Sequence, residues 1–217
     1  EFANFYRFSK IHISVTQKKI NSNYINDYSK GYSSIIEAMK PYTINFTQKQ
    51  AGFKVQHKEH IEYVELKKAT YNLIKKLQKN LVVEGKNEVI LADTPVKLMS
   101  KVHQLYSGTV KFESGKSMIV DTSKAEYISK RFKGEVIAIF YKFKEEYKAL
   151  KEIMGDNLTD DLEEFNTTNK NIALQIVSGR EGISLKKASS IVYYNIDFSA
   201  TSYWQSRDRM TTNKRLH

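Results

Sequence analysis

The sequence predicts an α/β fold in which helices flank a parallel sheet, and three observations support this prediction. The second half of the chain contains three short apolar runs of strand length, at residues 136–141, 172–177 and 190–194. These runs do not alternate apolar with polar residues, which is typical of strands covered on both faces. A helical pattern over 143–154 separates the first two runs. Strands that alternate with helices imply parallel strands joined by right-handed crossovers.

Three more helices are expected beside this sheet. Ser123 is placed to cap a helix over 124–133, which carries apolar residues on one face. A short acidic helix is expected over 160–165, because carboxylates are favoured at a helix amino terminus. A closing helix is expected over 200–209. These helices and the three strands place the sheet domain at residues 117–217.

The first half of the chain, residues 1–116, is expected to form a mainly helical region that leads into the sheet. The strongest signal is apolar residues at three-and-four spacing between Leu66 and Leu81, which is typical of an amphipathic helix. Residues 60–66 alternate apolar and polar side chains, as a half-buried strand does. The remaining expected elements are two helices and a hairpin, at residues 33–41, 95–107 and 109–120.

The composition excludes several classes of protein. A chain of 217 residues with 41% hydrophobic residues can bury a substantial core. No apolar run approaches the length of a membrane span, and the first residues lack the pattern of a secretory signal. The absence of cysteine excludes disulfides and thiolate metal sites, and no His-Glu-x-x-His motif occurs. We therefore expect a cytoplasmic protein with no membrane partner and no metal site of its own.

The charge is strongly basic and unevenly distributed. The formal net charge is +11, and residues 1–116 carry 19 Lys and Arg against 10 Asp and Glu. Residues 117–217 carry 16 against 14. A basic excess indicates a polyanionic partner, because neutralising phosphates releases counterions. Lysine-rich surfaces are also common in compositions rich in Lys, Asn and Ile, so the charge alone leaves contact with nucleic acid open.

A glycine-containing loop, Ser178-Gly-Arg-Glu-Gly-Ile-Ser-Leu185, follows the second apolar run. Open α/β sheets bind ligands at the carboxyl ends of their strands. Gly179 and Gly182 permit a tight turn there and let backbone amides approach a phosphate closely. An ordinary loop between a strand and a helix would explain this segment equally well.

The closing helix carries Gln205 and Arg209, which are four residues apart and therefore share one face. Together with the strand beginning near Ala188 and the loop before it, this order resembles motifs V and VI of superfamily-two helicases. The likeness is greatest to the Swi/Snf-like DNA translocases. Residues 136–150 resemble motif IV with its following helix.

This resemblance implies a RecA-like second helicase lobe over 117–217, with 1–116 leading into it. It implies the C-terminal motor lobe of an ATP-dependent DNA helicase or translocase, with DNA and ATP as partners. Arg209 would be the arginine finger, assisted by Gln205, and Glu181 and Gly182 would lie nearest the nucleotide. The residues expected to contact the DNA backbone are Tyr141, Lys142, Lys144, Ser178, Gly179 and Arg180.

The parts of a helicase that hold ATP and Mg²⁺ do not occur in this sequence. Ser114-Gly-Lys-Ser117 resembles the end of a phosphate loop, but valine occupies position 110, where that motif requires glycine. No Asp-Glu-Ala-Asp or Asp-Glu-x-His box is present. We therefore expect ATP and Mg²⁺ to be held mainly by an N-terminal lobe that is missing here, and the chain to be a piece of a longer protein that is inactive alone.

One departure from the family pattern leaves an alternative open. The family usually carries a second arginine three residues after the first, where this chain has Thr212. Either Arg209 acts alone, or Lys214 or Arg215 takes the second role. The alternative function is a non-catalytic DNA-binding module on a degenerate helicase lobe. Phage-encoded members of the family look similar in this region, so we expect a phage or prophage origin.

Overall fold

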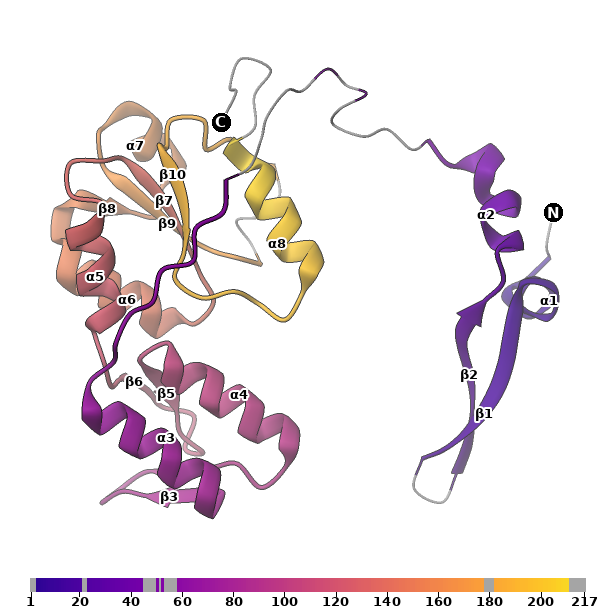
Figure 1. The fold of residues 1–217 in the computed structure, drawn as a ribbon, viewed down its shortest axis with the longest axis horizontal. Helices are drawn as coiled ribbons and strands as arrows, with labels where there is room; N and C mark the ends of the chain where they lie inside the picture. Colours follow the sequence, from indigo (N-terminus) through magenta and orange to yellow (C-terminus); the bar gives the residue numbers. More distant parts are fainter. Residues whose placement is uncertain are drawn as a thin grey trace. The chain divides into compact units, whose positions relative to one another are not determined.

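The computed structural model describes residues 3–20, 23–44, 50, 52, 58–177 and 182–210. The chain divides into two compact units, residues 1–53 and 54–217 (Figure 1). The domain boundary predicted between residues 116 and 117 lies inside the second unit, at the start of strand β6.

The first unit is built on a β-hairpin, so the prediction of a mainly helical amino-terminal region is wrong here. Strands β1 (Ile13–Ile20) and β2 (Asn23–Gly31) pair antiparallel. Valine, isoleucine, threonine and tyrosine in these segments favour strands. The helices are short: α1 (Phe5–His12), α2 (Ser34–Met39) and the 3₁₀ turn η1 (Lys40–Tyr42). Of these, α2 confirms the helix predicted over 33–41.

The second unit begins with two helices and two hairpins that share one apolar cluster. The elements are α3 (Lys68–Asn80), β3 (Val82–Glu84), β4 (Val89–Leu91), α4 (Pro95–Tyr106), β5 (Thr109–Lys111) and β6 (Ser117–Ile119). Ile74 and Leu77 of α3 are buried against Leu105 of α4. Helix α3, helix α4 and the β5–β6 hairpin confirm three predictions, whereas the β3–β4 hairpin was not predicted.

The strand predicted over 60–66 does not form. This segment is extended and pairs with no strand in the part of the chain that the structure describes. Its side chains do not alternate between buried and exposed, because Ile61 is 80% exposed and Tyr63 is 88% exposed, whereas Leu66 is only 8% exposed. Side-chain contacts hold the segment instead, and Glu62 accepts a hydrogen bond from the Tyr127 hydroxyl at 2.9 Å.

The rest of the second unit is a four-stranded parallel sheet, as the sequence predicts. The strand order is β10-β7-β9-β8, and each adjacent pair is parallel. The strands are β7 (Ile137–Tyr141), β8 (Leu158–Thr159), β9 (Asn171–Gln175) and β10 (Ser190–Tyr193). Strand β8 was not predicted, since two residues give no readable pattern.

Helices cover the sheet and bury its two faces in separate clusters (Figure 1). The helices and 3₁₀ turns are α5 (Ser123–Arg131), α6 (Lys144–Met154), η2 (Gly155–Asn157), α7 (Leu162–Thr167), α8 (Ala200–Arg207) and η3 (Asp208–Met210). Ile139 packs with Ile128 of α5 and Leu150 of α6. Phe140, which points to the other face, packs with Phe165 of α7. This alternation fixes which side of each strand faces which helix.

A buried carboxylate, rather than the predicted serine cap, organises the start of α5. Asp121 is 2% exposed. Its Oδ1 accepts hydrogen bonds from the Ser123 backbone N–H at 2.9 Å and from the Ser123 hydroxyl at 2.6 Å. Its Oδ2 accepts from the Lys67 N–H and the Thr70 hydroxyl, both at 2.7 Å. Asp121 thereby joins the start of α3 to the start of α5.

We expect Asp121→Ala to lower the free energy of unfolding by about 3 kcal/mol, because it leaves several buried donors without an acceptor. Burial raises the pKa of Asp121, but its four hydrogen bonds outweigh burial and bring the pKa below its ordinary value. The contribution is therefore present above about pH 3.9 and is lost as the pH falls through the lowered pKa. Urea denaturation at several pH values measures this. The surface carboxylate Asp93, replaced by alanine, is the control and should change stability little.

Candidate functional site at the carboxyl edge of the sheet

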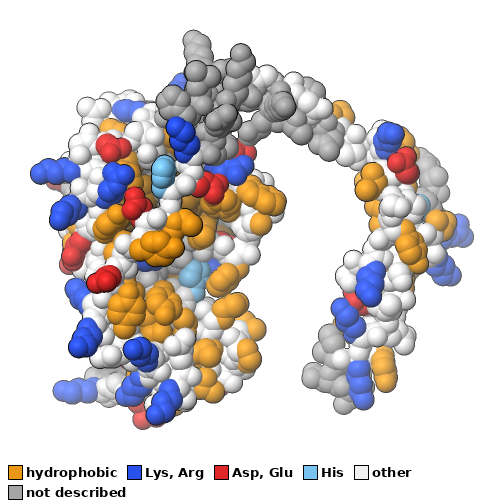
Figure 2. Space-filling model, in the orientation of Figure 1, with side chains coloured by type: hydrophobic (Ala, Val, Ile, Leu, Met, Phe, Trp, Pro, Cys, Tyr) orange, Lys and Arg blue, Asp and Glu red, His pale blue; other side chains and the backbone are white. Residues whose placement is uncertain are grey.

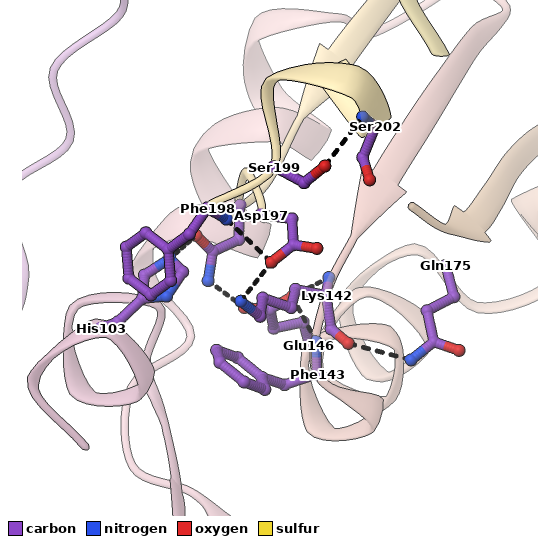
Figure 3. Close-up of polar contacts among 10 residues, drawn as sticks. His103, Lys142, Phe143, Glu146, Gln175, Asp197, Phe198, Ser199 and Ser202 are labelled. Carbon is purple, nitrogen blue, oxygen red and sulfur yellow. Dashed lines mark hydrogen bonds and ion pairs between the residues drawn. The ribbon is translucent and has the colours of Figure 1, made fainter. Parts of the chain in front are cut away.

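The segments that follow β7, β9 and β10 meet at one edge of the sheet, because parallel strands end on the same side (Figure 3). The Gln175 side-chain Nε2 at the end of β9 donates to the Lys142 carbonyl oxygen after β7, at 3.1 Å. The Lys142 ammonium lies 2.6 Å from Asp197 Oδ1, beyond the end of β10. These two contacts connect all three segments.

Glu146, on the first turn of α6, is the centre of this edge. Its side chain is fully buried. Its Oε2 accepts hydrogen bonds from the backbone N–H groups of Lys142 at 2.7 Å and Phe143 at 3.0 Å. Its Oε1 accepts from Asn195 Nδ2 at 2.8 Å. A single carboxylate thus satisfies backbone donors before α6 and anchors the segment after β10.

His103 connects helix α4 to the same network. Its Nε2 lies 2.5 Å from Asn195 Oδ1. Since Asn195 Nδ2 donates to Glu146, Oδ1 is the acceptor and His103 Nε2 carries the proton. Burial lowers the pKa of His103, although the hydrogen bond with Asn195 opposes this. The ring packs against Phe198 and Phe143, with centroids 4.7 and 5.6 Å apart. The His103 ring therefore joins α4 to the segment that follows β10.

Tyr141, Lys142 and Lys144, which the sequence proposes as DNA contacts, lie at the end of β7 and the start of α6. Tyr141 packs against Tyr147, and burial raises the pKa of its hydroxyl. Lys142 is ion-paired with Asp197, and the hydrogen bond from Lys142 lowers the pKa of that carboxyl. Lys144 is exposed and forms no ion pair with any described residue. The structure therefore leaves Lys144 available to a ligand but engages Lys142.

The loop after β9 is described only in part. Ser178, Gly179, Arg180 and Glu181 lie outside the described residues. Gly182 has φ +69°, a left-handed conformation that side chains rarely adopt, and no atom lies within 4 Å of where its Cβ would be. Backbone conformation, not lack of space, therefore requires glycine at this turn.

Helix α8 begins at the carboxyl end of β10 and carries Gln205, followed in η3 by Arg209. The Arg209 backbone oxygen accepts a hydrogen bond from the Leu185 N–H at 2.9 Å, three residues after Gly182. Arg209 Nε donates to the Gln205 carbonyl oxygen at 3.1 Å. The Gln205 side-chain Oε1 is buried and has no hydrogen-bond partner among the described residues. Thr212, Lys214 and Arg215 lie outside them.

A cavity of about 560 Å³ lies beside β10, between α5, α8 and the extended segment at residues 58–64. Two arginines line it, and each is already matched by a glutamate of that segment. Arg131 lies 3.6 Å from Glu62, and Arg207 lies 3.6 Å from Glu59. The acidic segment therefore neutralises the two guanidinium groups that line this cavity.

Sequence reasoning missed His103, Glu146, Asn195 and Asp197. For Asn195 and Asp197 a signal exists, because polar residues directly after an apolar strand fall at the ligand edge of a parallel sheet. Glu146 sits at the third position of α6, where a glutamate commonly caps. His103 gives no local signal, since its partner is distant along the chain.

Comparison with protein-family models and with curated proteins finds no match to this chain. Among the described residues, no group of three or more His, Asp or Glu side chains could hold a metal ion. None of the helices described here is long and apolar enough to span a membrane.

Proposed function

We propose that the chain is the C-terminal, RecA-like motor lobe of an ATP-dependent DNA helicase or translocase of the Swi/Snf-like group. The hydrogen bond between the Leu185 N–H and the Arg209 oxygen is the observation that carries this proposal. It brings the segment after Gly182 against η3, the 3₁₀ turn that follows α8 and carries Arg209. The sequence resemblance to motifs V and VI requires this proximity, because those motifs serve one nucleotide site.

In this proposal ATP and Mg²⁺ are held mainly by a first lobe that these 217 residues do not supply. The Arg209 guanidinium, from the lobe formed by this chain, reaches the nucleotide site and stabilises charge on the transferring phosphoryl group. Gln205 presents a buried side-chain oxygen with no described partner, which is suited to orienting a polar group beside the phosphates. The resemblance to motif V assigns Glu181 and Gly182 to the nucleotide side of the site.

DNA would be held by its phosphates at the edge formed by the segments after β7 and β9. Contacts with phosphate position the nucleic acid but carry no base information, so little sequence preference is expected. Affinity should fall steeply as salt rises, since each neutralised phosphate releases counterions.

The 217-residue chain alone is expected to bind DNA but to hydrolyse no ATP, because half of the nucleotide site is absent. Phosphate release measured with and without DNA tests this. Turnover by the chain alone that disappears in Arg209→Ala would contradict the requirement for a first lobe. DNA binding without any effect of Arg209→Ala in the longer protein would instead favour the non-catalytic binding module.

A further inference from the structure

A second groove, of about 400 Å³, lies between the β5–β6 hairpin and the start of α6. We propose that it binds the sugar–phosphate backbone of duplex DNA. This inference rests on the proposed function, because it assigns part of the DNA-binding surface to a hairpin outside the helicase-like motifs. The residues that carry it are Lys111 of β5 on one wall and Lys144 of α6 on the other.

Surface charge alone does not mark this site. On the visible face of the second unit, basic side chains are interspersed with acidic and hydrophobic ones (Figure 2). Which lysines are already neutralised therefore decides where an anion can bind. Three lysines near the groove are engaged within the chain: Lys101 with Glu113 at 3.3 Å, Lys116 with Glu88 at 3.4 Å, and Lys142 with Asp197 at 2.6 Å.

Lys111 and Lys144 differ from these three. Both are exposed, and neither forms an ion pair with any residue that the structure describes. Glu145 also lines the groove, but its Oε1 lies 3.4 Å from the Lys148 ammonium, so this ion pair neutralises its charge. Within the described part of the chain, the two lysines on the walls of the groove thus have no carboxylate partner. The phosphates of a DNA strand lying in the groove would neutralise both charges.

The neutral lining also suits phosphate rather than bases. Ser117 of strand β6 lines the groove and supplies a hydroxyl that can donate to a phosphate oxygen. Phe143 also lines the groove, but its ring packs against His103. Contacts of this kind position a backbone without reading sequence.

The hairpin turn leaves the groove accessible. Gly115 has φ +88°, and no atom lies within 4 Å of where its Cβ would be. Ser114-Gly-Lys-Ser117 is thus the turn of a hairpin and not a phosphate loop, since Ser117 begins a strand rather than a helix. Its Ser114 hydroxyl donates to Glu88 at 2.5 Å, which ties the turn to the β3–β4 hairpin.

The test compares two double variants of the full chain that remove the same charge. Lys111→Gln with Lys144→Gln removes the groove lysines. Lys75→Gln with Lys79→Gln removes two exposed lysines of α3 that do not line the groove. Binding to a short fluorescein-labelled DNA duplex of mixed sequence is measured by anisotropy over a range of salt, and thermal unfolding confirms that both variants fold.

We expect the slope of log affinity against log salt to fall by roughly 2 in the groove variant, because each lysine removed takes away about one neutralised phosphate. The α3 variant should keep the slope of the unsubstituted chain. Equal slopes for the two variants overturn the groove assignment. If that happens while Arg209→Ala still abolishes ATP hydrolysis in the longer protein, the proposed function stands. If the unsubstituted chain shows no salt-dependent DNA binding, both proposals are wrong.

Discussion

Replacing Arg209 by alanine is expected to reduce DNA-stimulated ATP hydrolysis by about 10³-fold or more in the two-lobed helicase proposed above. This corresponds to at least about 4 kcal/mol of transition-state stabilisation. The physical reason is that Arg209 supplies a delocalised positive charge to the transferring phosphoryl group in the proposed site. Steady-state phosphate release with saturating DNA measures it, and DNA affinity should remain unchanged.

The structure indicates that this substitution disturbs few described contacts. Among the described residues, the Arg209 side chain loses its Nε hydrogen bond to the Gln205 carbonyl oxygen, while its backbone oxygen keeps the bond from Leu185. Arg207→Ala is the matched control, because it removes a neighbouring arginine, at the end of α8, that is ion-paired within the chain to Glu59 and Asp208. Arg209→Lys should remain impaired, since an ammonium lacks the planar fork of guanidinium. Equal losses in the Arg209→Ala and Arg207→Ala variants would contradict the assigned role.

Replacing Glu146 by alanine is expected to lower the free energy of unfolding by about 3–5 kcal/mol. Its carboxylate is fully buried and accepts three hydrogen bonds, so its removal leaves the Lys142 and Phe143 amides and the Asn195 amide unsatisfied. The partly buried Lys124 also loses a nearby opposite charge, which otherwise opposes the lowering of its pKa by burial. Urea denaturation measures the change in stability.

Two comparisons sharpen the Glu146 prediction. Glu152→Ala, on an exposed position of the same helix, should change stability by less than about 0.5 kcal/mol. Glu146→Gln keeps the shape but replaces one acceptor by a donor, so an intermediate loss is expected. Hydrogen exchange at the Lys142 and Phe143 amides should accelerate in Glu146→Ala. Unchanged exchange there would show that the carboxylate does not hold this segment.

Local patterns predicted many of the elements of the second unit. Helices α3 and α4 follow from apolar residues at helical spacing, which is a property of neighbours in the sequence. The parallel sheet follows from apolar strands that alternate with helices. The predictions failed where pairing or exposure depends on distant residues. The β1–β2 hairpin was missed, and residues 60–66 have the alternation of a strand without a strand beside them.

The residues of the candidate site also fall into those that local sequence patterns predict and those that they do not. Gly182 could be singled out because a tight turn restricts a single residue, and its left-handed backbone agrees with that expectation. The hydrogen-bond network at the sheet edge could not be predicted from the sequence, because His103 and Asn195 are 92 residues apart, and Lys142 and Asp197 are 55 apart. No local rule connects such pairs.

The sequence by itself determined the helices of the second unit and its parallel sheet through strands β7, β9 and β10, because periodicity and composition act between near neighbours. It also determined which residue types stand at the carboxyl ends of the strands. Only the tertiary structure decided which of those charges are already neutralised. It engages Lys142 with Asp197, leaves Lys111 and Lys144 facing a groove, and buries Glu146 as an acceptor. The reason is that desolvation and ion pairing depend on distances in space, which chain folding sets and spacing along the sequence does not.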